Sequence, residues 1–402
     1  MRPMVLLFVA LFNSILGLSV LFPIFGPLGR QLELSELEVG ALTAGYSLMQ
    51  LLLAPFWGRR SERVGRKPIL ITGVLGFAGG FFLFGLVAWA GLQGWLAHWP
   101  LVGLLLASRI IGGAFSSATM PTAQAYAADL SERENRTSAM AVIGAAFGLG
   151  IIFGPVIGAV LVEITGGSLL APVWFSASVA VVNALFIALR LPESTERVET
   201  AVATMGSLFG KVWPILAVGL VATAASVALE QTIAFYFQDR LGITEEETPR
   251  YVGGALLVYG IVAVFAQGYL VRRKKMAPLT LLRVGMPIAI AGYVGFAFAT
   301  DFWTLTLTLA AQGLGQGLLL PGVTAAASLA VDEDNQGSVA GLSSASSGVG
   351  RLVGPLLGGG LYTALRLADG VGPELTYAVS AGLLGAVFLV VLVRPSIVVA
   401  ER

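Results

Sequence analysis

The sequence predicts an all-α integral membrane protein, with twelve transmembrane helices arranged as two pseudo-symmetric six-helix bundles. Hydrophobic residues make up 56% of the 402 residues and charged residues only 12%, whereas a soluble domain carries about 25% charge. Apolar runs of about 20 residues, each long enough to cross a hydrocarbon core of about 30 Å, recur along the whole chain. A glycine–proline pattern also occurs twice, 200 residues apart. Such a duplication is typical of secondary transporters, whose substrate lies between the two repeats.

Each predicted span is an apolar run bounded by polar residues and long enough to meet the length requirement. The spans are 4–26, 39–59, 68–91, 100–128, 137–164, 168–190, 212–238, 250–271, 279–299, 302–330, 337–367 and 373–393. The longest polar gap follows the sixth span. It predicts a first half at 1–195, a cytoplasmic linker at 196–211 and a second half at 212–402.

The Lys and Arg residues are distributed unevenly between the two sides of the membrane. An even number of spans places both termini on one side. Eighteen of the 24 Lys and Arg residues lie on that side, and four lie in the opposite loops. The positive-inside rule therefore predicts that both termini and the linker are cytoplasmic. We expect a multi-pass protein of the cell (inner) membrane.

The repeated pattern lies in the fifth and eleventh spans. A Gly-x-x-x-Gly-Pro sequence occurs in each, at Gly150, Gly154 and Pro155 and at Gly350, Gly354 and Pro355. Glycines four residues apart leave a smooth helix face that allows close backbone approach, and proline bends a helix. We therefore expect a kinked, closely packed pivot in each half. The same offset relates Gly113 to Gly313.

The loop after the second span is a tight turn crowded with positive charge. It extends from Gly58 to Pro68 and contains Glu62, Arg63, Gly65 and Arg66. A basic anchor that obeys the positive-inside rule is one interpretation of this loop. The spacing of its glycines and acid favours a second interpretation.

A glycine, an acid four residues later and then Gly-Arg-Lys resemble the loop signature of the major facilitator superfamily. With Arg109 and the repeated glycine–proline pattern, the layout resembles the twelve-span drug:proton antiporter branch, and it is similar to tetracycline-resistance exporters. The resemblance covers nearly the whole chain. It implies that Glu62 bonds to a helix terminus in the other half and so latches the cytoplasmic side. A carboxylate is favourable at the N-terminus of a helix.

Two departures from the family pattern affect what the resemblance implies. Aspartate is commoner than glutamate at the position of Glu62. Tetracycline-type exporters carry an acid in the first span, where this chain has Asn13 and Ser14. The proton path therefore cannot be copied from them.

Charged residues inside spans are functional candidates, because each is costly in a membrane. Arg109 costs at least about 2.5–3.5 kcal/mol and needs a carboxylate, carbonyl groups or water. The resemblance implies a proton-relay or conformational role for it; a structural arginine is the alternative. Glu230 is the only acid well inside a predicted span, and we expect it to carry the exchangeable proton. A permanent Glu230–Arg351 pair is the alternative, and Asp129 is the next proton candidate.

Other polar residues within the spans predict a wet, charge-poor cavity. Isolated amides also bond neighbouring helices, which is the alternative interpretation. The candidate substrate-binding residues are Asn13, Tyr46, Gln50, Gln231, Tyr236, Gln312, Gln316 and Arg351.

The leading functional hypothesis is a secondary active transporter that exports small amphipathic organic molecules in exchange for protons by alternating access. A proton-coupled importer of a metabolite or sugar is the alternative. No clustered His, Cys or acidic motif indicates an enzyme, and no repeated filter indicates a channel. The absence of cysteine and the single histidine, His98, predict no metal site, and we expect no cofactor. The expected partners of this monomer are a small-molecule substrate, protons and the lipid bilayer, with no nucleic acid.

Overall fold

The computed structural model describes residues 3–130, 136–194, 205–271, 276–331, 335–368 and 372–395, and these residues contain helices and no strand. The chain divides into two compact units. The first unit comprises 1–200 and 244–253, and the second comprises 201–243 and 254–402. Residues 196–204 of the predicted linker and the basic run 272–275 lie outside the described residues.

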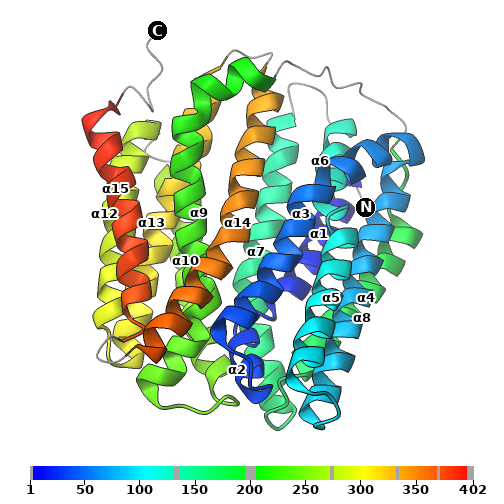
Figure 1. The fold of residues 1–402 in the computed structure, drawn as a ribbon. Helices are drawn as coiled ribbons and strands as arrows, with labels where there is room; N and C mark the ends of the chain where they lie inside the picture. Colours follow the sequence, from blue (N-terminus) through cyan, green and yellow to red (C-terminus); the bar gives the residue numbers. More distant parts are fainter. Residues whose placement is uncertain are drawn as a thin grey trace. The chain divides into compact units, whose positions relative to one another are not determined.

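The described residues before the linker form helices α1 to α8 (Figure 1). They are α1 (Pro3–Ser19), α2 (Phe25–Gln31), α3 (Glu36–Val64), α4 (Arg66–Leu92), α5 (His98–Ser116), α6 (Thr119–Asp129), α7 (Arg136–Ile164) and α8 (Ala171–Arg190). The helices after it are α9 (Met205–Leu241), α10 (Thr248–Phe265), the π-helix η2 (Ala266–Val271), α12 (Pro278–Phe298), α13 (Phe302–Leu329), α14 (Gln336–Leu367) and α15 (Leu375–Val393).

Local sequence sets several of these helix ends. Ser35 and Glu38 form a capping box that begins α3, which satisfies backbone N–H groups of the first turn. Asp301 caps α13 and accepts hydrogen bonds from Trp303 and Thr304. The bonds from the Thr304 side chain and backbone hold the pKa of Asp301 below its ordinary value, because they stabilise the ionised carboxylate.

Two predicted spans are interrupted in the structure. The first, predicted at 4–26, is helical as α1 only to Ser19 and continues in turns at 20–24, before α2 begins at Phe25. The fourth becomes α5 and α6, with a break at Ser117 and Ala118. Ser117 Oγ bonds to the carbonyl of Ala114 at 2.8 Å, and such bonds compete with regular helix geometry.

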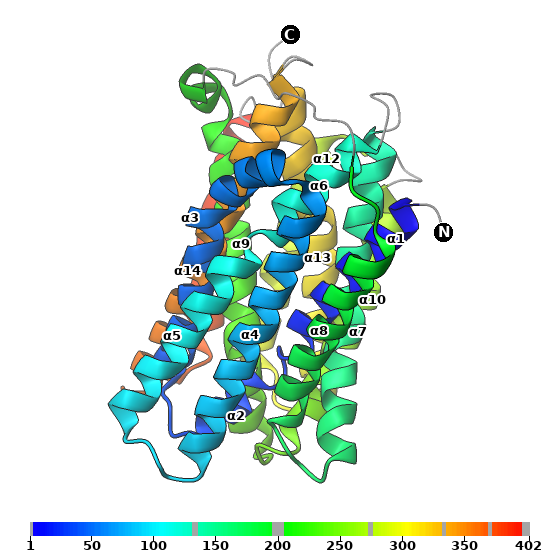
Figure 2. The same ribbon diagram turned by 90° about the vertical axis from the view of Figure 1, so that its right-hand side faces the viewer.

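Each unit is a bundle held together by close helix pairs. In the first unit, α1 packs on α7 and α8, and α4 packs on α5 and α8 (Figure 2). In the second unit, α9 packs on α14, and α12 packs on α13 and α15.

The glycine faces of α7 and α14 make the close contacts that the sequence predicts. A Cβ on Gly150 would lie 2.8 Å from Ile15 Cβ, and one on Gly154 would overlap Ser19 Oγ, both in α1. In α14, a Cβ on Gly354 would lie 2.8 Å from the Ala224 carbonyl oxygen in α9. Both helices continue through their prolines. These close contacts agree with the packing expected of the glycines, and the kink and the movement of the pivot stay predictions.

A second pair of glycines shows that the two units repeat one packing arrangement. A Cβ on Gly113 of α5 would lie 2.7 Å from the carbonyl oxygen of Tyr46 in α3. Gly313 of α13 contacts the carbonyl oxygen of Tyr259 in α10 in the same way. Tyr46 and Tyr259 therefore hold equivalent positions in the two copies.

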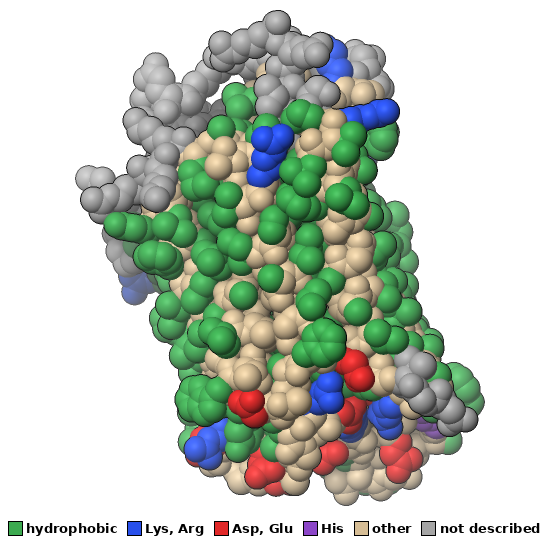
Figure 3. Space-filling model, turned by 90° about the vertical axis from the view of Figure 1, so that its left-hand side faces the viewer, with side chains coloured by type: hydrophobic (Ala, Val, Ile, Leu, Met, Phe, Trp, Pro, Cys, Tyr) green, Lys and Arg blue, Asp and Glu red, His purple; other side chains and the backbone are tan. Residues whose placement is uncertain are grey.

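Nine helices in the described part of the chain are long and apolar enough to cross a membrane. Of the other predicted spans, α1 has 17 residues, while α13 and α14 carry many small and polar residues. On the face in Figure 3, hydrophobic side chains cover the middle and charged ones gather at the two ends. The span count of twelve and the cytoplasmic location of the termini stay predictions.

Candidate functional site

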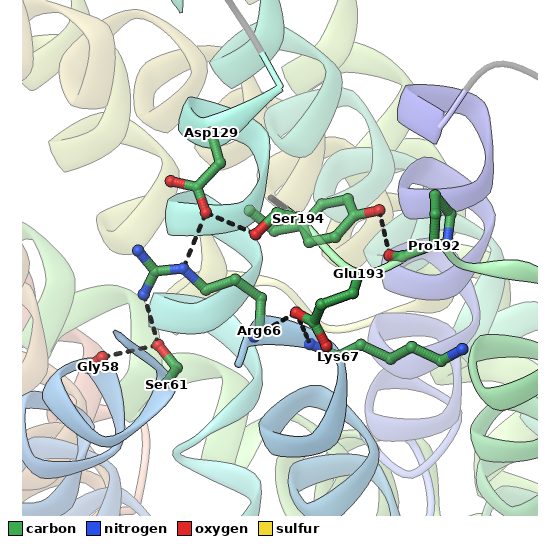
Figure 4. A network of polar contacts seen from close by, with 9 residues as sticks. Gly58, Ser61, Arg66, Lys67, Asp129, Pro192, Glu193 and Ser194 are labelled. Atoms are coloured by element: carbon green, nitrogen blue, oxygen red, sulfur yellow. Dashed lines mark hydrogen bonds and ion pairs between the residues drawn. The ribbon is translucent and has the colours of Figure 1, made fainter. Parts of the chain in front are cut away.

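A network of polar side chains connects the α3–α4 turn, the end of α6 and the segment after α8 in the first unit (Figure 4). Arg66 Nε donates to Asp129 Oδ2 at 2.9 Å, and Arg66 Nη1 donates to Ser61 Oγ at 2.7 Å. Ser194 Oγ also donates to Asp129 Oδ2, at 2.8 Å. The side chains of Arg66 and Asp129 are only 7% and 2% exposed, so each charge depends on the other for compensation.

Glu193 binds the N-terminus of α4. Its Oε1 accepts hydrogen bonds from the backbone N–H groups of Arg66, at 2.7 Å, and Lys67, at 3.1 Å. A carboxylate at this position satisfies orphan donors and interacts favourably with the helix dipole. The approach requires glycine at position 65, because Gly65 has φ +110° and a Cβ there would lie 3.1 Å from the Glu193 carboxyl group.

The conformational residues predicted in this loop divide into two groups. Gly65 and Arg66 belong to the network, and Gly58 accepts a hydrogen bond from Ser61. Glu62 and Arg63 are exposed, and the latch proposed for Glu62 stays a prediction. Within the first unit, Glu193 is the carboxylate at the N-terminus of α4.

Arg109 of α5 is enclosed by aromatic rings. It is 4% exposed, and its guanidinium carbon lies 4.5 Å from the ring centre of Tyr46 and 5.0 Å from those of Phe25 and Phe81. A desolvated cation–π contact contributes about 2 kcal/mol, so three contacts offset an insertion cost of about 2.5–3.5 kcal/mol. Aromatic faces thus supply contacts to this cation, and the expected contact with a carboxylate, carbonyl groups or water stays a prediction.

The substrate candidate Tyr46 of α3 lies beside Arg109, and it is hydrogen-bonded to a second candidate, Gln50. Ser116 Oγ donates to the Tyr46 hydroxyl at 2.7 Å, and Gln50 Nε2 donates to Ser116 Oγ at 2.9 Å. The ring of Tyr46 therefore contacts the guanidinium of Arg109, while its hydroxyl group is hydrogen-bonded to Ser116 and Gln50.

Glu230 of α9 lies in a polar cluster of the second unit. Its Oε1 accepts a hydrogen bond from Ser226 at 3.0 Å. Tyr259 of α10 interacts with both Ser226 and Glu230, and the positive charge of Arg351 in α14 acts on Glu230. The cluster thus combines an acid with a cation and two hydroxyl groups.

Two predicted amides lie in the same region, together with a tyrosine that the sequence did not single out. Gln312 and Gln316 of α13 are buried. Tyr293 of α12 is within interaction range of both amides, and also of Tyr259 and Glu230. Gln316 Nε2 donates to the Ala222 carbonyl at a long 3.4 Å. Helix packing, rather than any sequence motif, brings Tyr293 to the acid.

The remaining substrate candidates are not part of these contacts. The Tyr236 hydroxyl donates to the Ala297 carbonyl at 3.0 Å and accepts from Arg240, in a different part of the second unit. Gln231 is buried in α9, and Asn13 is partly buried in α1. Their predicted contact with substrate stays untested.

The described residues contain no group of three or more His, Cys, Asp or Glu side chains that could hold a metal ion. Their charged and polar side chains can exchange protons and form hydrogen bonds with an organic molecule.

The sequence as a whole matches one family description. The Major Facilitator Superfamily matches residues 7–302 and 281–400. Multidrug resistance protein 2 of Bacillus subtilis is 29% identical over 367 residues, which cover 88% of this chain and 86% of the relative. The class C tetracycline resistance protein of Escherichia coli is 29% identical over 370 residues, which cover 87% of this chain and 86% of the relative.

Solved transporter structures share the fold. The crystal structure of the nucleoside transporter NupG aligns with a TM-score of 0.76 over 100% of both chains, at 13% identity. At this identity the likeness supports the fold alone.

Proposed function

This chain belongs to the Major Facilitator Superfamily and is a multi-pass membrane transporter rather than an enzyme. On this basis we propose that it exports small amphipathic organic molecules in exchange for protons, by alternating access. The two drug-resistance relatives described above support export. We also propose that it acts as a monomer with both termini in the cytoplasm.

The observation that carries the proton-exchange proposal is the Glu230 cluster. Glu230 lies in a membrane-spanning helix, is hydrogen-bonded to Ser226 and is acted on by Arg351. A carboxylate in such a position is a functional-site candidate by default, and proton relays are among the roles of such residues. Asp129 is the weaker candidate, since it is the buried counter-ion of Arg66.

We expect Glu230→Gln to abolish transport driven by a pH gradient while leaving substrate exchange at equal pH intact. Glutamine retains the size and hydrogen bonding of the side chain but cannot ionise. Both rates are measured in proteoliposomes, with the exposed Glu163→Gln as the matched control. Gradient-driven transport by Glu230→Gln with an unchanged pH profile would place the proton elsewhere.

The direction of transport is tested in cells and liposomes, with ethidium and tetracycline as probes. Expression in an efflux-deficient bacterium should raise tetracycline tolerance or lower ethidium accumulation, and a protonophore should cancel the effect. One net charge moving through 100 mV supplies about 2.3 kcal/mol, enough for a gradient of about fifty-fold. Movement of probe and protons in the same direction would favour the symporter alternative.

A further inference from the structure

Four buried polar atoms that make no regular hydrogen bond within the described residues lie on Tyr293, which interacts electrostatically with Glu230, and on the two amides with which Tyr293 interacts. They are Tyr293 Oη, both amide atoms of Gln312 and Gln316 Oε1. The three side chains are 0%, 2% and 3% exposed. Buried polar groups in folded proteins nearly always have a partner, either in the protein or in ordered water. A cluster of such atoms at one place therefore indicates a molecule that satisfies them.

Glycine contacts hold these side chains in place. A Cβ on Gly292, next to Tyr293 in α12, would lie 3.0 Å from the backbone nitrogen of Gln312. Gly313, next to Gln312, contacts the carbonyl oxygen of Tyr259. Because α10, α12 and α13 meet at backbone distance here, the helices that carry these side chains are held closely against one another.

The cluster suits water rather than a drug-sized compound. Its unpartnered atoms are out of reach of solvent, so a bulky molecule cannot contact them. A buried water needs two to four polar partners. The Tyr293 hydroxyl and the Gln312 nitrogen supply donors, while the Gln312 and Gln316 oxygens supply acceptors.

The cluster is also connected to the acid. Tyr293 is within interaction range of Tyr259 and Glu230. Tyr259 interacts with Ser226, and Ser226 Oγ donates to Glu230 Oε1. Enclosed water would complete a chain of oxygen atoms, through these hydroxyl groups, that ends at the carboxylate.

We propose that Tyr293, Gln312 and Gln316 enclose ordered water next to Glu230, and that this water is the route by which the Glu230 carboxylate exchanges its proton. The route, but not the water site, rests on the function proposed above. Each oxygen along the chain accepts one proton and releases another. One new O–H bond forms on Glu230, and the donor at the far end of the chain loses one.

Thermal unfolding tests the water site without reference to transport. Tyr293→Phe removes only the hydroxyl. If water bridges that hydroxyl to the amides, the variant loses hydrogen bonds and its Tm falls. If the site is dry, the variant removes an unsatisfied polar group and its Tm stays the same or rises. The matched control is Tyr377→Phe, which removes a buried hydroxyl bonded to Thr232 Oγ1 at 3.2 Å. We expect both variants to lower the Tm, and an unchanged or raised Tm for Tyr293→Phe overturns the proposal.

Proton flux tests the route. In proteoliposomes containing trapped pyranine, Tyr293→Phe should slow tetracycline- or ethidium-coupled proton movement at least tenfold and leave exchange of the same probe at equal pH unchanged. A lowered Tm with an unchanged proton flux would overturn the route and keep the water site. Gradient-driven transport by Glu230→Gln would instead contradict the proposed function, and the Tm comparison would still decide whether the site holds water.

Discussion

We expect Gly154→Leu to reduce transport to background while the protein still inserts into the membrane. Gly154 is the centre of the contact between α7 and α1. A Cβ there would overlap Ser19 Oγ and lie 2.8 Å from the Ser19 backbone carbon. Overpacking commonly costs about 1–3 kcal/mol, and a leucine adds three further carbon atoms at a site with no free space.

Transport and membrane abundance are measured together, with Gly144→Leu in the same helix as the control, because no atom lies within 4 Å of a Cβ at Gly144. Gly154→Ala provides a milder variant should the leucine prevent folding. Normal transport by Gly154→Leu at normal abundance would show that this contact does not move.

The second large effect is expected at the ion pair of Arg66 and Asp129. Asp129→Asn keeps the shape of the side chain but leaves a buried guanidinium without its counter-ion. Removing one partner of a buried pair costs about 3–5 kcal/mol, and both side chains are buried enough for that range to apply. Thermal unfolding of the purified protein should therefore show a clear loss of stability.

The double variant Arg66→Met with Asp129→Leu is the control for this pair. Replacing both charges by apolar groups is often neutral, so it should recover most of the stability lost in Asp129→Asn. A single variant as stable as the parent would mean that Ser61 and Ser194 alone satisfy the site.

The sequence predicted those parts of the fold that depend on helix periodicity and backbone approach. The duplicated glycines identified the contacting faces of α7 and α14, because a missing Cβ acts in the same way in any tightly packed helix pair. The offset between Gly113 and Gly313 likewise predicted two copies of one packing arrangement.

Contacts set by tertiary packing could not be predicted. Arg109 is surrounded by rings from three other segments of the chain, and no local pattern relates Phe25 and Phe81 to it. Glu193 follows α8 by a few residues, yet it binds a helix more than 120 positions earlier. Tyr293 comes into range of Glu230 only because Gly292 and Gly313 allow three backbones to meet.

The equivalence of Tyr46 and Tyr259 has an electrical consequence. In one copy the tyrosine ring faces an arginine, and in the other the tyrosine interacts electrostatically with a glutamate. A guanidinium stays protonated at every physiological pH, whereas a carboxyl group can gain or lose its charge. The two halves therefore respond differently to pH. Acidifying the medium can change the charge of Glu230 in the second half, whereas the charge of Arg109 in the first half stays fixed.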